Sequence, residues 1–131
     1  MKSEKKLLLD KIKKLDIKKR ISFVVVYGSF LTKRYNKLSD IDIAIYYEGN
    51  SKERFKFRLA LSGELPDRFD IHIFQDLPLY IKNEIVKNGK IIYKRDIKNV
   101  SAIYISVIRQ FSRFEKYIQH YYEHLKGDAL A

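Results

Sequence analysis

Two aspartates one residue apart, Asp40 and Asp42, are the side chains of this sequence best suited to chemistry. They alternate with isoleucine in Asp40-Ile41-Asp42-Ile43, a pattern typical of a β-strand. Because residues i and i+2 of a strand point to the same face, we expect the two carboxylates to project side by side. Adjacent carboxylates resist joint ionisation unless a cation lies between them, and oxygen ligands suit Mg²⁺ or Mn²⁺. The pair predicts a divalent-metal site; the alternative is the polar side of a half-exposed strand.

A glycine–serine pair, Gly28-Ser29, follows an apolar run and precedes this strand. Glycine lets the backbone approach a ligand closely, and the free N–H groups at the start of a helix favour a phosphate. A short helix from Ser29 to Tyr35 would provide such a start. A phosphate cradle that faces a metal-binding carboxylate pair is the equipment for phosphoryl or nucleotidyl transfer.

The spacing of these motifs is similar to that of a known family. Gly28-Ser29, ten intervening residues and Asp40-Ile41-Asp42 resemble the signature of minimal nucleotidyltransferases in the DNA polymerase β superfamily. The family also carries a third carboxylate on a later strand, which Asp70 fits. The resemblance extends over residues 20–96.

The resemblance implies roles for these residues. Asp40 and Asp42 would hold Mg²⁺ or Mn²⁺. Asp70 would be a third ligand of the metal or would deprotonate the attacking hydroxyl. Gly28 and Ser29 would orient the phosphates of ATP.

One segment departs from the pattern of the family. Leu31, Thr32 and Lys33 stand where many relatives have small residues and an Arg-Gly pair. Lys33 and Arg34 are candidates to supply the missing positive charge. His72 shares the predicted strand face of Asp70, and we interpret it as a hydrogen-bonded neighbour outside the site.

The same resemblance implies transfer of AMP from ATP to a hydroxyl. Small members of the family often act as antitoxins, so the expected acceptor is a tyrosine of a HEPN-type toxin. The alternative is a non-catalytic antitoxin that neutralises its partner by binding alone.

Composition narrows the class of protein. The chain has 131 residues, no cysteine and a formal net charge of +11. One domain is expected, without disulfides or thiolate zinc sites. The charge favours polyanionic partners such as nucleotides; nucleic acid is a further, less favoured possibility. No signal peptide or membrane-spanning run is evident, so we expect a cytoplasmic protein.

Helical and strand patterns alternate along the chain and predict an α/β fold, for which the resemblance implies a mixed, twisted sheet. Helices are expected over residues 3–19, from a cap at Asn50 to Gly63, and from Pro78 to Gly89. Strands are expected over residues 21–27, 40–47, 68–74 and 91–94. In the second helix Phe55, Leu59, Leu61 and Phe57 are the candidate core residues.

The C-terminal segment carries a separate signal. We interpret residues 1–96 as the nucleotidyltransferase core, 97–126 as one long helix and 127–131 as a frayed tail. Apolar residues recur in the helix at steps of three and four, at Val100, Tyr104, Val107, Phe111, Phe114, Ile118, Tyr121 and Leu125. This seam is longer than a small domain, so we expect part of the helix to meet another chain, which would make the protein a homo- or hetero-oligomer.

Overall fold

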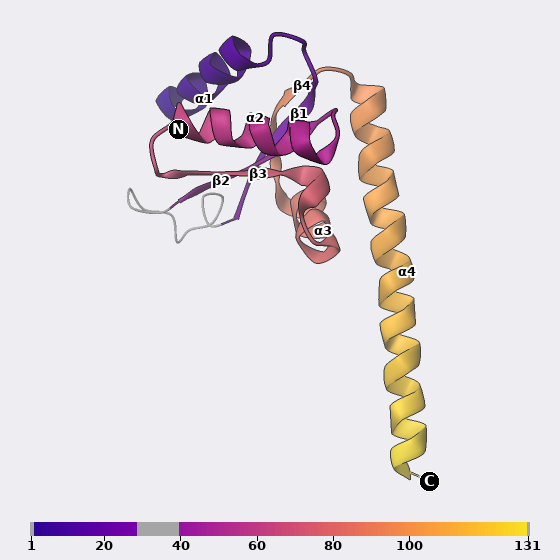
Figure 1. The fold of residues 1–131 in the computed structure, drawn as a ribbon. Helices are drawn as coiled ribbons and strands as arrows, with labels where there is room; N and C mark the ends of the chain where they lie inside the picture. The colour runs from indigo at the N-terminus through magenta and orange to yellow at the C-terminus, as the bar shows by residue number, and fades with distance from the viewer. Residues whose placement is uncertain (1, 29–39, 131) are drawn as a thin grey trace.

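A four-stranded sheet forms the centre of the molecule (Figure 1). The computed structural model describes residues 2–28 and 40–130. The elements, in chain order, are α1 (Lys2–Leu15), β1 (Ile21–Tyr27), β2 (Ile41–Tyr47), α2 (Ser51–Gly63), β3 (Phe69–Ile73), the 3₁₀-helix η2 (Phe74–Asp76), α3 (Leu79–Asn88), β4 (Lys90–Lys94) and α4 (Ile97–Leu130). This confirms the predicted α/β class with a long C-terminal helix.

The sheet is mixed, with strand order β3-β2-β1-β4. Strand β1 pairs antiparallel with both β2 and β4, whereas β2 and β3 are parallel. β1 lies inside the sheet, and its residues from Ile21 to Val26 are all buried, as its almost wholly apolar sequence predicts. The parallel pair matters for function, because it brings the same ends of β2 and β3 together.

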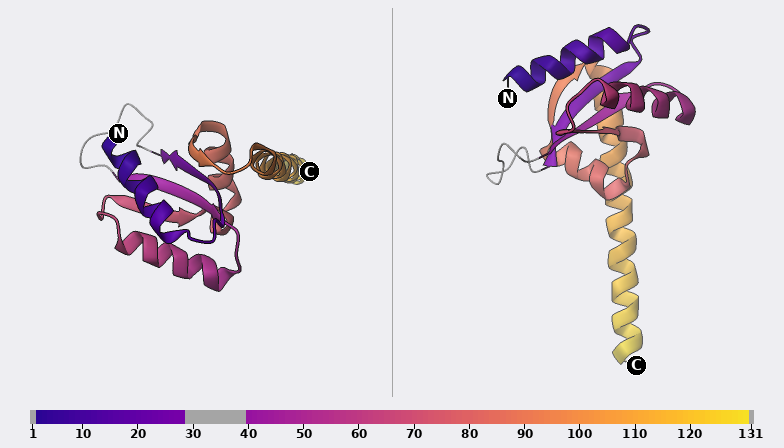
Figure 2. Two further views of the ribbon diagram at one scale, coloured as in Figure 1. Left: turned by 90° about the horizontal axis from the view of Figure 1, so that it is seen from above. Right: turned by 60° about the vertical axis from the view of Figure 1, so that its left-hand side comes forward.

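Helices cover both faces of the sheet. Figure 2 shows α1 and α2 on one side, with α3 and the first turns of α4 on the other. Leu8 and Ile12 of α1 join Phe57 and Leu61 of α2 in the first core layer. The second layer lies under α3 and α4, and includes Phe23, Val25, Ala44, Phe74, Ile85, Val100 and Val107.

Helix α1 is shorter than its sequence pattern predicts. It begins at Lys2, so Ser3 lies inside it, and it ends at Leu15 rather than Lys19. The carboxylate of Asp16 accepts hydrogen bonds from the backbone N–H groups of Arg20 and Ile21, at 2.9 and 3.0 Å. This contact fixes a turn that competes with further helix.

Helix α2 buries two of the four residues that the sequence predicted for its core face. Phe57 and Leu61 are buried, but Phe55 and Leu59 are 57% and 56% exposed. The sequence interpretation of Phe55 and Leu59 as core residues was therefore wrong. The ring of Phe57 stacks on that of Tyr47 at 4.5 Å between centroids, so packing against β2 selects this face.

Helix α4 extends well past the sheet (Figure 1). It continues to Leu130, where the sequence predicted a frayed tail from Gly127. A lone glycine in an exposed helix costs about 1 kcal/mol relative to alanine, which does not by itself end a helix. Within the described ranges, none of the helices is long and apolar enough to cross a membrane.

Candidate active site

Three neighbouring strands place a tyrosine and two aspartates in one row. Tyr27 of β1 pairs with Asp42 of β2, and Asp42 pairs with Asp70 of β3. Residues paired directly across a sheet project from the same face. The parallel register of β2 and β3 therefore sets the two carboxylates beside each other.

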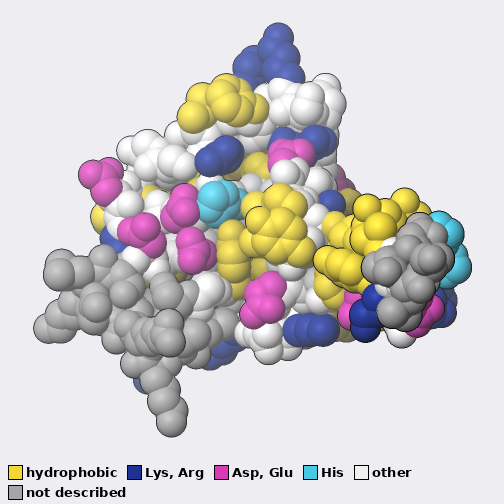
Figure 3. Space-filling model, turned by 90° about the horizontal axis from the view of Figure 1, so that it is seen from below, with side chains coloured by type: hydrophobic (Ala, Val, Ile, Leu, Met, Phe, Trp, Pro, Cys, Tyr) yellow, Lys and Arg dark blue, Asp and Glu magenta, His cyan; other side chains and the backbone are white. Residues whose placement is uncertain are grey.

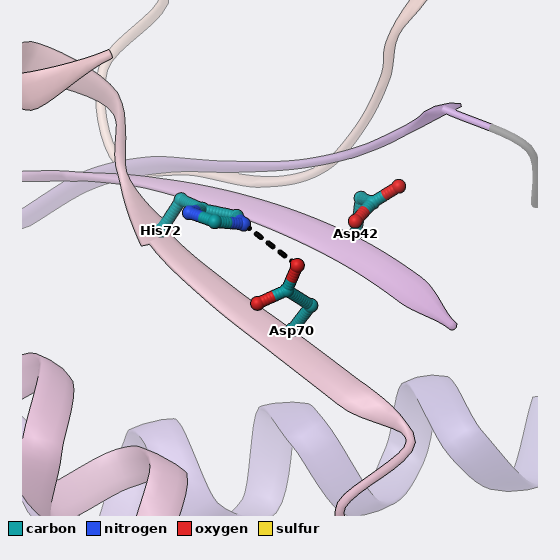
Figure 4. A group of neighbouring side chains, drawn as sticks. All are labelled: Asp42, Asp70 and His72. Atoms are coloured by element: carbon teal, nitrogen blue, oxygen red, sulfur yellow. Dashed lines mark ion pairs between the residues drawn. The ribbon is translucent and has the colours of Figure 1, made fainter.

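His72 joins the two carboxylates because it follows Asp70 at the next position on the same face. One ligand atom from each of Asp42, Asp70 and His72 lies within 4.8 Å of the others. His72 Nε2 is 2.9 Å from Asp70 Oδ2 (Figure 4). Figure 3 shows acidic side chains gathered around a histidine on this face.

Burial and neighbouring negative charge both disfavour the ionised forms of Asp42 and Tyr27. The pKa of Asp42 is raised by burial and then by the charge of Asp70, while His72 acts in the opposite direction. Asp40 adds a smaller increase to the pKa of Asp42. Burial, followed by the charges of Asp42 and Asp70, also raises the pKa of the Tyr27 hydroxyl. A nearby cation would relieve each of these effects.

Gly28 lies directly against Asp42. Its φ of +75° falls in the left-handed region, and a Cβ at this position would stand 2.3 Å from Asp42 Oδ2. Only glycine meets both demands without displacing the carboxylate. The backbone at Gly28 therefore approaches the carboxylate that pairs with Asp70, whereas the predicted approach to a phosphate stays a prediction.

The remaining predicted site residues lie elsewhere or outside the described ranges. Asp40 is exposed, precedes β2 by one residue and is not part of the group formed by Asp42, Asp70 and His72. Ser29, Lys33 and the predicted short helix lie outside the described residues. His72 was placed outside the site by sequence reasoning, although its alternation with Asp70 was the signal that it shares the face.

The donor set fits a divalent cation. It combines two carboxylates with an imidazole, and burial together with the charge of Asp70 penalises the charged form of half-buried Asp42. Carboxylate oxygens suit Mg²⁺ and Mn²⁺, and neutral imidazole is accepted by Mn²⁺. Asp42, Asp70 and His72 are therefore the described residues that could hold such an ion.

The amino-acid sequence also matches a family model and a named relative. The family described as polymerase beta, nucleotidyltransferase, matches residues 10–98. A protein of Methanocaldococcus jannaschii named "Putative protein adenylyltransferase MJ1547" is 40% identical over 75 residues, which is 57% of each chain. The matched stretch thus spans little more than half of that relative.

Solved structures share the fold at low sequence identity. One described as a toxin–antitoxin with AMP-PNP has a TM-score of 0.71 at 15% identity, covering 97% of this chain and 98% of the other. A tri-AMPylated Shewanella oneidensis HEPN toxin in complex with MNT antitoxin has 0.64 at 18%, covering 97% and 99%. The family model spans more than half of the chain and includes all four strands of the sheet. The chain therefore belongs to the polymerase β-type nucleotidyltransferases.

Proposed function

We propose that the protein is a metal-dependent adenylyltransferase that moves AMP from ATP to a hydroxyl group of a protein. The observation that carries the proposal is the pairing of Asp42 with Asp70 beside the backbone of Gly28. The name of the M. jannaschii relative supports the type of group transferred. ATP is abundant in the cytoplasm, where we place the reaction.

In this reaction the acceptor oxygen forms a bond to the α-phosphate while the bond from the α-phosphate to the bridging oxygen of pyrophosphate breaks. Asp42 and Asp70 would hold the divalent cation, with Asp40 as a further candidate. A bound cation supplies positive charge that stabilises the transition state and the leaving pyrophosphate. Asp70 accepts the proton of the acceptor hydroxyl, and Gly28, Ser29 and Lys33 bind the phosphates.

We further propose a tyrosine of a HEPN-type toxin as the acceptor, which would make the protein an antitoxin. Supporting this, similar folds occur in structures described as toxin–antitoxin complexes, one with a tri-AMPylated toxin. The projecting half of α4 supports a protein partner too, since its apolar side chains are exposed. They include Phe114, Tyr121, Tyr122 and Leu125, with exposed fractions of 48%, 50%, 61% and 43%.

The test uses the protein encoded by the neighbouring open reading frame as acceptor. The full chain is incubated with it, with ATP labelled at the α-phosphate, and with Mg²⁺ or Mn²⁺. We expect label on a tyrosine of the partner, located by mass spectrometry, and loss of label with Asp42→Asn plus Asp70→Asn. Asp10→Asn, an exposed position on α1, is the control and should label normally.

A purely binding antitoxin is the second candidate, favoured by the departure at Leu31, Thr32 and Lys33 from the family pattern. It predicts that the double variant neutralises the partner as well as the native chain does. Neutralisation of that kind, together with no label from the native chain, would overturn the catalytic proposal.

A further inference from the structure

We infer that His72 is a nitrogen ligand of the catalytic cation, which shifts the site from Mg²⁺ towards Mn²⁺. The inference rests on the proposed function, because it concerns the cation that Asp42 and Asp70 would hold. It differs from an all-carboxylate site in the chemistry of its third ligand.

The distance between His72 and Asp70 is that of two adjacent ligands of an octahedral ion. For metal–ligand distances of about 2.1 Å, adjacent ligands lie about 3 Å apart and opposite ligands about 4.2 Å apart. His72 Nε2 is 2.9 Å from Asp70 Oδ2, which matches adjacent ligands. The ligand atoms of all three residues lie within 4.8 Å of one another, a limit that slightly exceeds the separation of opposite ligands, so a small shift of Asp42 would complete the set. The 2.9 Å contact suits donation from Nε2–H to the carboxylate. As a ligand, His72 would instead present the Nε2 lone pair to the ion and carry its ring proton on Nδ1.

The sheet gives the imidazole room to take this role. His72 pairs with Ala44 on β2, so the position across the strand holds only a methyl group. Tyr27 lies on another side, with 6.4 Å between the ring centroids. Figure 4 shows His72, Asp70 and Asp42 standing on the same side of the two strands. The ring is therefore held between an aromatic neighbour and the carboxylate pair.

The ligand type sets the choice of metal. Mg²⁺ binds oxygen almost exclusively in proteins and retains its waters, whereas Mn²⁺ accepts an imidazole nitrogen as well. A set of two carboxylates and one imidazole should therefore bind Mn²⁺ more tightly than Mg²⁺. Removing the nitrogen should lower the affinity for Mn²⁺ and leave that for Mg²⁺ nearly unchanged.

The experiment measures cation binding by the full chain without nucleotide. Free Mn²⁺ is followed by electron paramagnetic resonance, Mg²⁺ by competition, and nitrogen ligation by ¹⁴N modulation of the bound Mn²⁺ signal. For His72→Gln, which offers an amide oxygen instead, we expect Mn²⁺ affinity to fall on the order of tenfold, with loss of the ¹⁴N modulation. His120→Gln, exposed on α4, is the matched control and should change neither.

The outcomes separate this inference from the proposed function. Mn²⁺ that binds the native chain without ¹⁴N modulation, with an unchanged Mn²⁺-to-Mg²⁺ preference in His72→Gln, would overturn the inference and leave the metal-dependent transferase standing. No cation binding by the native chain, or equal binding by Asp42→Asn, would remove the metal site itself and with it both proposals.

Discussion

At the scale of single residues, Asp42 combines burial with the charge of its neighbour. Its pKa is raised above the ordinary value of 3.8. The cation-free folded protein therefore keeps the Asp42 proton to higher pH than the unfolded chain does. By linkage, the contribution of this group to stability is fully present below the unfolded pKa and is lost as pH rises through the folded pKa.

Asp42→Asn removes the loss of stability that the native chain undergoes when Asp42 ionises. We expect the free energy of unfolding of the variant minus that of the native chain to increase as pH rises above 3.8, and to level off above the folded pKa. Urea titrations at a series of pH values, with a chelator present, measure this difference. The lowered pKa values of Glu48, Glu53 and Glu64 act in the opposite direction but cancel between the two proteins.

A divalent cation should reverse the order of stability. It binds the folded native chain and stabilises it by mass action, and it has less effect on Asp42→Asn. A difference that stays flat with pH in the chelator would show that neither burial nor Asp70 raises the pKa of Asp42, and that the charge argument for the site is wrong.

Gly28 offers a second prediction at this scale. In Gly28→Ala the left-handed backbone costs about 1 kcal/mol, and the new methyl group must also displace the Asp42 carboxylate that would lie 2.3 Å away. We expect lower stability in urea and a loss of cation affinity measured by the Mn²⁺ signal. The control is Gly63→Ala at the end of α2, where no atom lies within 4 Å of the new Cβ.

Residue types and spacing pointed to Gly28 and to Asp42, whose carboxylate alternates with isoleucine, and the family resemblance added Asp70. The structure brings these three together, and their roles stay predictions. His72 was visible by the same alternation but has two common explanations, a hydrogen-bonded neighbour and a ligand. The position of Asp42 across the strand, opposite Asp70, favours the ligand, and the cation-binding experiment tests it. Sequence alone does not give strand pairing, so it could not decide.

At the scale of elements, the pairing of β2 with β3 is what makes the site. The sequence predicted both strands to within a residue or two, but not that they are parallel neighbours; strand order was left to the family resemblance. The boundaries that sequence missed have local causes. The side chain of Asp16 ends α1 early, and the stacking of Phe57 on Tyr47 rotates α2 away from the expected face.

The start of α2 gives a prediction for an element. Asn50 accepts from Glu53 N–H at 2.9 Å, and the Glu53 carboxylate accepts from Asn50 N–H at 3.0 Å. The predicted cap at Asn50 is confirmed, and the two bonds together form a capping box. Asn50→Ala should lower the free energy of unfolding by about 1 kcal/mol, because a helix N–H loses its acceptor. Urea unfolding measures the change, with Lys52→Ala on the exposed side of the same turn as control.

Loss of this cap should not reach the active site. The carboxylate of Glu53 also pairs with Arg20, so the helix retains one anchor to the sheet-bearing part of the chain. Cation affinity in Asn50→Ala should equal that of the native chain. A large drop would mean that α2 positions β3, and hence Asp70, more directly than its packing indicates.

At the scale of the whole molecule, α4 is divided into two parts by what it contacts. Val100 and Val107 are buried under the sheet, and Phe111 lies 5.8 Å from the Lys87 ammonium of α3. Beyond Phe111 the same apolar seam continues with no part of the described chain burying it. The apolar seam and the predicted length of residues 97–126 led us to expect that part of this helix meets another chain. The 34 helical residues observed span about 51 Å, more than the small domain beside them.

The exposed seam leads to the last prediction, which concerns Phe114. If this part of α4 binds the proposed partner, Phe114→Glu should weaken binding on the order of tenfold to a hundredfold, because an aromatic anchor is replaced by a charge that must be desolvated. Calorimetric titration with the partner used in the labelling experiment measures the change. The stability of the free protein should change little, because Phe114 is 48% exposed.

Ser112→Glu is the matched control. It adds the same charge to the same turn of α4, but Ser112 is exposed and lies about 160° around the helix from Phe114, on the side away from the seam. Near-native affinity for Ser112→Glu with weak binding for Phe114→Glu would assign the contact to the seam. Equal affinities would place the partner on another surface, and the length of α4 would then need a cause other than recognition of that partner.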